Sequence, residues 1–251
     1  MSEIIKIQYV YNSCFTIDYR DCFIIIDYAE GALSIPPNRK VLFLVTHGHA
    51  DHYTPDIFRL PGSERAFYIL SDDIRPPRLR DNILLLSRSE EDTEQFKRIY
   101  DPSRVRRTHP GDHFFVEGIP FRIFGSTDLG TSIHFQLGEV SFFHSGDLNA
   151  WKWAEFTPQE QQKEVDDYVR ILEQIRPYPI DVGFGVVDPR LGAEAMLGPR
   201  LYLDLLQPQI FIPMHFREHP EITADCARQL ARPGCRIQTI EGAGEQILIH
   251  V

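Results

Sequence analysis

The chain has 251 residues, of which 43% are hydrophobic and 25% charged, as in an ordinary soluble globular protein. Its 36 acidic residues outnumber its 26 basic residues, so the formal net charge is −10. A negative surface discourages contact with phosphate backbones and anionic lipids, and no apolar run approaches the ~18 residues of a membrane span. We therefore expect no nucleic-acid partner and no membrane partner.

The four cysteines form no CxxC pair and are too sparse for a disulfide framework in a chain of this length. Cys14 and Cys22 alternate with apolar residues and are expected to be small buried core residues. The N-terminus lacks the basic and apolar stretches of a secretory signal. These features favour a cytoplasmic, reducing location.

The residue pattern in the first half of the chain predicts mainly short strands. Apolar residues there either alternate with polar ones or form short continuous runs. A helix is expected to open near Thr54, and another is expected in the charged stretch around residues 91–100. The expected strands are residues 4–10, a hairpin of 14–18 with 22–27, and then 41–46, 66–70 and 82–86.

Four more strands are expected between residues 114 and 145, each separated from the next by a short turn. Beyond them, helices and strands alternate. Thr157 and Glu160 form a capping box with Pro158 at the first helical position, which predicts a helix to about Arg176. The remaining predicted elements are a strand at 180–187, a helix at 193–206, a strand at 209–213, a helix at 222–231, and a closing pair of strands at 236–240 and 246–251.

This order of elements indicates an α/β chain with a strand-rich first half and helix–strand alternation after it. No linker, internal repeat or low-complexity segment separates the parts. We therefore expect one compact domain over residues 1–251.

The segment HGHADH is the strongest chemical signal in the sequence. It places His47, His49, Asp51 and His52 within six residues, directly after a buried strand. A strand end is a rigid position from which a loop can aim several ligands at one point. Imidazole and carboxylate suit divalent ions such as zinc, manganese or iron. A solvated histidine-rich turn is the alternative, but packing rarely requires three histidines at this density.

Two later residues have the character of further ligands. Asp147 follows a strand and a glycine turn, and His215 follows another buried strand. Taken alone, each has an ordinary structural interpretation, as a turn-capping aspartate or a histidine at a strand end. Together with the HGHADH segment they predict one metal cluster.

The HxHxDH run, the later Gly-Asp pair and the histidine after the last buried strand together resemble the metallo-β-lactamase superfamily. The opening hairpin, with Asn12-Ser13-Cys14-Phe15 and a strand ending at Asp27, is also similar to that family, so the resemblance covers the whole chain. It implies an αβ/βα four-layer sandwich with two metal ions at one edge, between the halves.

The resemblance also implies a division of the ligands. His47 and His49 would bind the first metal, and Asp51, His52 and His215 the second. Asp147 would bridge the two ions, and Asp27 would support the site from behind. Zinc is the expected metal, with manganese and iron as alternatives.

One position departs from the family pattern. The superfamily places a third histidine for the first metal before the Gly-Asp motif, and here Asp128 stands in its place. We expect Asp128 to be the ligand; His134 is a rival, but it lies within a predicted strand whose side chain can face the other layer. An aspartate would shift the metal preference toward manganese or iron.

Two bridged ions would acidify a bound water for attack on a carbonyl carbon or a phosphorus. Asp51 would orient this water and exchange its proton. Arg190, after another buried strand, is a candidate to grip a carboxylate or phosphate, or else a surface arginine capping the next helix. His144 would either donate to a leaving group or brace Asp147. Trp151 and Trp153 are candidates for a pocket wall.

The leading hypothesis is a metal-dependent hydrolase of a small anionic or cyclic ester, lactone or phosphodiester. The motifs STDxGxS, HSGDLNAWKW, VDPRLG and IPMHF resemble an uncharacterised bacterial branch near the ascorbate-6-phosphate lactonase group, whose substrate class that resemblance does not supply. The alternatives are a nuclease of the same fold and an iron-containing redox or sensor protein. A homo-oligomer is compatible with the sequence.

Overall fold

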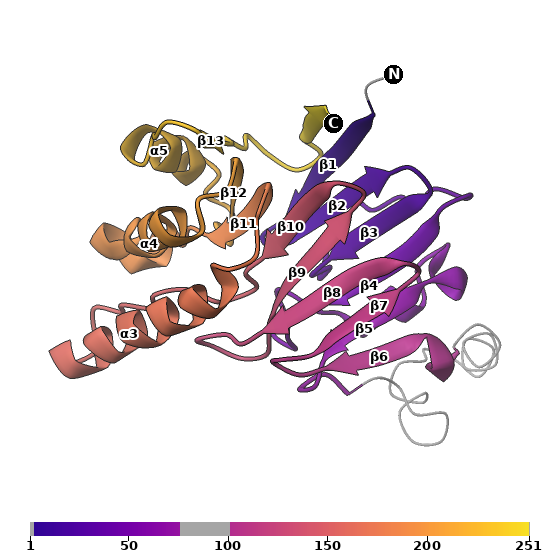
Figure 1. Ribbon diagram of the computed structural model, residues 1–251, viewed down its shortest axis with the longest axis horizontal. Helices are drawn as coiled ribbons and strands as arrows, with labels where there is room; N and C mark the ends of the chain where they lie inside the picture. Colours follow the sequence, from indigo (N-terminus) through magenta and orange to yellow (C-terminus); the bar gives the residue numbers. More distant parts are fainter. Residues whose placement is uncertain (1–2, 76–100, 251) are drawn as a thin grey trace.

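The computed structural model describes residues 3–75 and 101–250. The strand expected at residues 82–86 and the helix expected around 91–100 lie outside the described residues. In the described part, two seven-stranded sheets pack face to face, and the helices α3, α4 and α5 cover the outer face of the second sheet (Figure 1).

The first sheet combines an antiparallel half and a parallel half. The hairpin β2–β3 and the strand β1 pair antiparallel, whereas β3, β4, β5 and β6 run parallel. The strand order is β14 (Gln246–His250), β1 (Ile4–Tyr11), β2 (Cys14–Tyr19), β3 (Cys22–Ile26), β4 (Lys40–Val45), β5 (Phe67–Ser71) and β6 (Val105–Thr108).

The second sheet repeats this division. Strands β7 to β10 form an antiparallel meander, and β10 to β13 run parallel. The strand order is β13 (Arg236–Ile237), β12 (Ile210–Met214), β11 (Val182–Val186), β10 (Val140–His144), β9 (Ser132–Leu137), β8 (Ile119–Phe124) and β7 (His113–Val116).

Some strands carry apolar side chains on both faces, because one face packs against the other sheet and the opposite face packs against the outer layer. On β4, Leu42 points between the sheets, where it joins a cluster with Phe135 and Phe142, whereas Phe43 points outward and stacks on Tyr68 at 5.4 Å. This is the pattern of a parallel strand buried on both sides.

Helix α3 (Pro158–Ile175) begins at the predicted capping box, in which Thr157 and Glu160 satisfy each other's backbone N–H groups. Its buried residues, which include Tyr168 and Leu172, recur at helical spacing and pack on the outer face of the second sheet with Tyr202. Helices α4 (Leu197–Leu206) and α5 (Glu221–Gln229) complete this outer layer.

Three expectations need correction. The helix expected near Thr54 is only a short 3-10 turn, Pro55–Phe58. The helix expected at 193–206 begins later, at Leu197, after a separate 3-10 segment with a kink at Gly192. The two closing strands do not pair with each other: β13 extends the second sheet beside β12, and β14 extends the first beside β1. Each strand joins a sheet edge that still has free backbone groups.

The carboxyl ends of β3, β4, β10, β11 and β12 meet at one edge of the sandwich, so the loops that follow them lie together. Among the described residues, no helix combines the length and the apolar character needed to cross a membrane.

Gly130 allows a close approach that positions this edge. Its φ is +74°, and a Cβ atom added there would lie 2.2 Å from the Thr46 carbonyl oxygen and 2.5 Å from Cβ of His47. Any larger residue would push the β8–β9 loop away from the end of β4.

We expect Gly130→Ala to lower the free energy of unfolding by about 3 kcal/mol, because backbone strain and a steric clash add together. The matched control is Gly234→Ala, where φ is +78° but no atom lies within 4 Å, so only the backbone strain of about 1 kcal/mol applies. Urea unfolding of the three proteins measures the difference; equal losses in both variants would contradict the proposed close-approach role.

Candidate metal centre

The structure brings the predicted ligands to one edge of the sandwich. His47, His49, Asp51 and His52 come from the loop after β4, in the first sheet, and Asp147 and His215 follow β10 and β12 in the second. Asp128 lies in the β8–β9 loop. They form three overlapping sets in which one donor atom per residue lies within 4.8 Å of the others: His47, His52 and Asp147; Asp51, His52 and His215; His49, Asp128 and Asp147.

Three donor atoms at the centre have no hydrogen-bond partner although they are buried. They are Nε2 of His52, Nε2 of His215 and Oδ1 of Asp147. Oδ1 of Asp147 lies 3.0 Å from Nε2 of His52 and 3.4 Å from Nε2 of His215. Buried polar atoms are normally satisfied, so three that converge on one point are evidence for a shared cation.

The two oxygens of Asp147 face different neighbours. Oδ1 faces His52 and His215, and Oδ2 lies 3.4 Å from Nε2 of His47. The side chain is 5% exposed, so neither oxygen depends on water for its contacts. A carboxylate in this position is able to contact an ion on each side.

Asp128 is close to the cluster but less enclosed. Its Oδ2 lies 3.8 Å from Nδ1 of His49, and the two side chains are 44% and 47% exposed. Thr127 anchors the loop, since its hydroxyl donates to the Asn149 carbonyl oxygen at 2.6 Å. His47 and Asp128 share no set of donors, so Asp128 approaches from the His49 side.

The rings of His47 and His52 are oriented by Thr46 and Asp27. The Asp27 carboxylate accepts from the Thr46 hydroxyl at 2.7 Å and lies 2.9 Å from Nδ1 of His52. Because the Thr46 hydroxyl donates its only proton to Asp27, it accepts from Nδ1 of His47 at 3.0 Å. Both rings therefore carry a proton on Nδ1 and turn Nε2 into the cluster, as ligand histidines do.

Asp188 plays the same part for His215. Its Oδ2 lies 3.0 Å from Nδ1 of His215, and it also accepts from the guanidinium of Arg190. Asp188 is fully buried, and its pKa is lowered to about 2: burial opposes this shift, but the bonds from His215 and Arg190 outweigh it. His215 is thus held by an ionised carboxylate.

The electrostatics of the centre favour bound positive charge. Burial raises the pKa of Asp147, but His215, His52 and His47 together hold it well below its usual value. Burial lowers the pKa of His52, but Asp147 and Asp27 outweigh this effect and raise it to about 10. The Asp147 carboxylate stays ionised and the pKa values of His52 and His215 are raised, so these two imidazoles take up protons that a divalent cation would replace.

Four residues in or beside the centre adopt a left-handed backbone conformation, which costs free energy for any residue other than glycine. Asn12, Asp27, His215 and Arg217 have φ of +48°, +48°, +64° and +53°. Such strain persists only where the surrounding structure compels it, and it is typical of functional sites.

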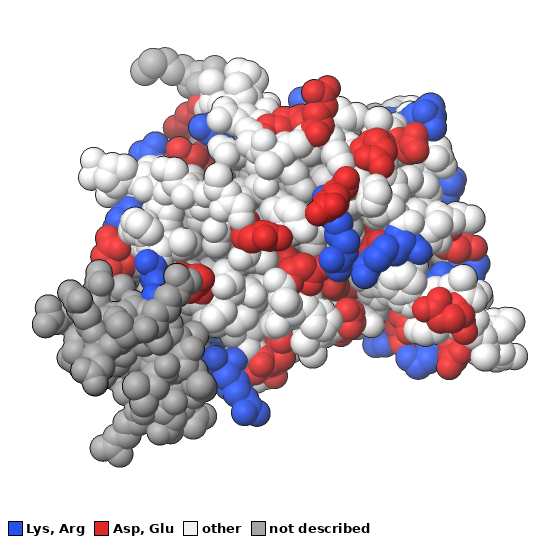
Figure 2. All heavy atoms as spheres, turned by 180° about the vertical axis from the view of Figure 1, so that it is seen from behind, with Lys and Arg blue, Asp and Glu red and all other residues white. Residues whose placement is uncertain are grey.

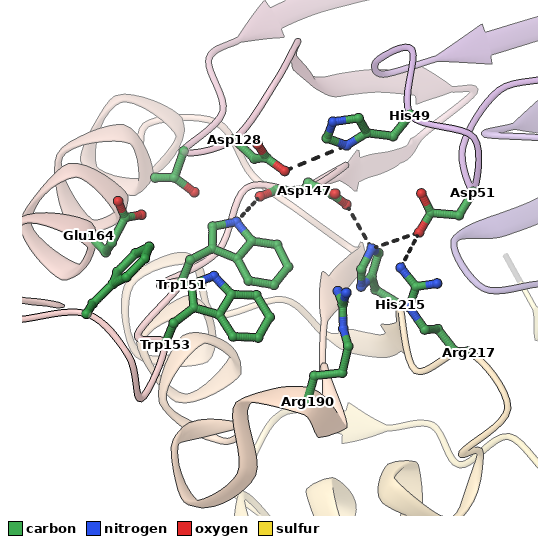
Figure 3. Close-up of a pocket in the computed structure, with 12 residues that line it drawn as sticks. His49, Asp51, Asp128, Asp147, Trp151, Trp153, Glu164, Arg190, His215 and Arg217 are labelled. Carbon is green, nitrogen blue, oxygen red and sulfur yellow. Dashed lines mark hydrogen bonds and ion pairs between the residues drawn. The ribbon is translucent and has the colours of Figure 1, made fainter. Parts of the chain in front are cut away.

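The cluster forms one end of a pocket of about 320 Å³ (Figure 3). This volume is at the lower limit for small-molecule sites. Trp151 and Trp153 stack at 5.5 Å along one side, and the Trp151 indole donates to the Asp147 carbonyl oxygen at 2.9 Å. The remaining lining residues are His49, Asp51, Thr127, Asp128, Asp147, Phe156, Glu164, Arg190, His215 and Arg217.

His144 and His134 do not line this pocket. His144 is fully buried; its Nε2 contacts the Ser13 carbonyl oxygen at 3.1 Å and its Nδ1 accepts from the Gly146 N–H at 3.2 Å. These contacts favour the interpretation that His144 braces the turn before Asp147 over that of a donor to a leaving group. His134 contacts the Pro179 carbonyl oxygen at 2.9 Å and stays apart from the cluster.

Three residues that touch or face the centre were not predicted from the sequence. Arg217 and Asn12 both donate to Oδ2 of Asp51, at 2.9 Å and 3.1 Å. Glu164 lines the pocket from α3. Glu164 could have been predicted, because it is a charged residue on the inward-facing side of an amphipathic helix. For Arg217 the only signal in the sequence was its position two residues after His215.

No protein-family model matches the sequence, and a search of curated proteins returns no match. Solved structures nevertheless share the fold. Igni18, a metallo hydrolase from the archaeon Ignicoccus hospitalis, aligns with a TM-score of 0.57 at 16% identity, over 98% of this chain and 98% of that chain. The metallo-β-lactamase fold protein YhfI from Bacillus subtilis aligns with a TM-score of 0.58 at 11% identity, over 98% and 99%.

CmlA, a diiron β-hydroxylase from Streptomyces venezuelae, aligns with a TM-score of 0.59 at 13% identity over 99% of this chain. The alignment covers 54% of CmlA, so this chain spans about half of that protein's length. At these identities the likeness concerns the fold, and the expectation of a four-layer metallo-β-lactamase sandwich is confirmed.

We expect Asp188→Asn to weaken zinc binding by about tenfold, because loss of this charge makes the His215 ring a poorer ligand. Competition with a chromogenic chelator measures the affinity. Asp204→Asn, at an exposed aspartate paired with Arg232 on the surface, is the control and should bind as the wild type does. Equal affinity in Asp188→Asn would show that Asp188 only caps the following turn.

We expect Asp128→Ala to weaken one bound metal equivalent by at least about tenfold and to leave the other unchanged, because Asp128 contacts only the His49 side. Stepwise chelator competition, with the metal content measured at each step, separates the two. Two equivalents with unchanged affinities would remove Asp128 from the ligand set.

Proposed function

We propose that this chain, which has the metallo-β-lactamase fold, is a hydrolase that holds two divalent ions and acts on a small ester, lactone or phosphodiester. The observation that carries the proposal is the convergence of three unpartnered buried donor atoms, on His52, His215 and Asp147, beside a pocket that His215 and Asp147 line. A merely structural cluster would have no reason to open onto such a space.

The donor set fits two ions of borderline to hard character. His49 and Asp128 lie on one side, and Asp51, His52 and His215 lie on the other. His47 lies between them, with Nε2 3.0 Å from Nδ1 of His49 and in one donor set with His52, and Asp147 faces both sides. Ions held there supply Lewis acidity and lower the pKa of a bound water toward neutrality. Imidazole with carboxylate suits zinc, and the aspartate at position 128 moves the preference toward manganese or iron.

Asp51 is placed to exchange the proton of the attacking water. Burial raises its pKa, but His215, His52 and Arg217 outweigh this effect and hold the carboxyl ionised. Its Oδ2 accepts from Asn12 and Arg217, which fix its direction. An ionised, oriented carboxylate beside the ions takes the proton as the water attacks and returns it to the leaving group.

The pocket end nearest the proposed ions carries two guanidinium groups. Arg190 and Arg217 both line the pocket, and their side chains are 45% and 37% exposed, so each keeps donors available to a ligand. Guanidinium groups pair well with carboxylate and phosphate oxygens. The stacked indoles of Trp151 and Trp153 exclude water from one side of the reacting groups.

A nuclease is the less favoured reading. On the face shown in Figure 2, the described basic side chains form small groups beside acidic ones and do not make a continuous basic surface. The net charge of −10 acts in the same direction. The iron-dependent redox alternative draws on the fold likeness to CmlA, and identification of the metal decides between it and hydrolysis.

The four cysteines are unpaired in the structure, which is compatible with our proposal of a reducing, cytoplasmic location. The side chains of Cys14, Cys22 and Cys226 are buried, as small core residues. A small-molecule substrate remains part of the proposal.

The decisive experiment combines elemental analysis of gently purified protein with a hydrolysis panel of lactones, esters and phosphodiesters. We expect close to two metals per chain, and a fall in kcat of at least about 100-fold in Asp51→Asn when its metal content is restored. Asp56→Asn, at an exposed aspartate of the nearby 3-10 turn, is the control and should keep full activity. Two metals with no turnover on any ester would refute the hydrolase proposal, and bound iron with oxygen-dependent turnover would replace it.

A further inference from the structure

The pocket carries two guanidinium groups at one end and a separate carboxylate at the other. At one end, Arg190 and Arg217 flank the predicted metal ligands; at the other, Glu164 reaches in from helix α3 (Figure 3). The indoles of Trp151 and Trp153 lie between Glu164 and the metal end, and Phe156 also lines the pocket. A carboxylate in this place has no part in the proposed hydrolysis.

The helix itself explains how Glu164 reaches the pocket. The capping box at Thr157 fixes the start of α3, and Glu164 lies one turn before the buried residue Tyr168. It therefore projects from the inward-facing side of the helix and is half-buried. Among the described residues, Glu164 has no hydrogen bond and no ion pair.

The basic side chains near this end are already paired with other carboxylates. Lys152 binds Glu194 at 2.8 Å, and Lys163 binds Asp167 at 2.6 Å. Glu164 is thus left as an acceptor beside aromatic surfaces, without a cation from its own chain.

This position is unfavourable for a carboxylate on its own. Burial raises the pKa of Glu164; Lys163 opposes the shift, and Asp167 and Asp128 add to it. A half-buried carboxylate has lost part of its hydration, so a positively charged partner stabilises its ionised form more than it would stabilise a fully hydrated carboxylate.

We propose that the Glu164 end of the pocket binds an aliphatic ammonium group of the substrate, so that the substrate carries a cation at one end and the scissile ester or phosphoester at the other. This substrate class rests on the proposed hydrolase function. Ammonium carbons pack on the aromatic walls formed by Trp151, Trp153 and Phe156, while the charge is balanced by Glu164.

The charge of the whole molecule agrees with this class. A chain of net charge −10 repels a purely anionic substrate at long range but admits one that carries its own cation. At short range, Arg190 and Arg217 select for the anionic oxygens at the metal end, and Glu164 selects for the opposite end.

The test is a binding measurement that does not need turnover. The chain contains two tryptophans, and both line this pocket, so intrinsic fluorescence reports on it directly. Zinc-loaded protein is titrated with choline and with butylammonium, and in parallel with their uncharged counterparts 3,3-dimethylbutan-1-ol and butan-1-ol. We expect at least one cation to bind about tenfold more tightly than its neutral counterpart.

Glu164→Gln should reduce that preference to about twofold or less, because the amide keeps the shape but not the charge. Glu173→Gln, at an exposed residue of the same helix paired with Arg176, should keep the full preference. Metal content and circular dichroism of each variant show that the fold and the centre are intact.

Two outcomes overturn the inference: no preference for either cation in the wild-type protein, or a preference that persists in Glu164→Gln. They are distinct from failure of the hydrolase proposal. Turnover of neutral esters without any cation preference would support the hydrolase proposal and refute the ammonium site. A Glu164-dependent cation preference without turnover of any ester would support the ammonium site and refute the hydrolase proposal.

Discussion

The arrangement at the sandwich edge depends on one buried carboxylate, that of Asp27. It is 0% exposed and accepts from the Thr46 N–H and hydroxyl, each at 2.7 Å, and it lies 2.9 Å from Nδ1 of His52. A buried charge that lacked such partners would cost several kcal/mol, so the three contacts are obligatory. They fix the direction in which the chain leaves β4 and therefore the positions of the candidate ligands in the loop that follows.

The centre is shared between the sheets, and hydrogen bonds join the two halves beside it. The Thr131 N–H donates to the Thr46 carbonyl oxygen at 2.9 Å, and the His215 N–H donates to the Asn12 carbonyl oxygen at 3.2 Å. His144 contacts the Ser13 carbonyl oxygen in the same region. These contacts hold the donors of one sheet against those of the other, which allows Asp147 to face both sides of the cluster.

The basic residues of the pocket are part of the same network. Arg190 contacts the carboxylate that orients His215, and Arg217 contacts Asp51 directly. A substrate that draws either guanidinium toward itself therefore changes the hydrogen bonding of a ligand residue or of its support. Glu164 lies outside this network, so it is able to take part in substrate selection without disturbing the metal ligands.

The sequence by itself determined the local features: the capped helix at Thr157, the apolar strands, and the run from His47 to His52, because each is written in neighbouring residues or in a short period. It also indicated Asp147 and His215 by their place after buried strands. Only the tertiary structure decided which sheets the final strands β13 and β14 join, that Asn12 and Arg217 contact Asp51, and that Glu164 lines the pocket. The physical reason is that the period of apolar residues indicates whether a residue is buried but does not identify the residue that it contacts. That contact is set by how the two sheets and a helix pack in space, and Asn12 and Arg217, which are hydrogen-bonded, lie 205 positions apart in the sequence.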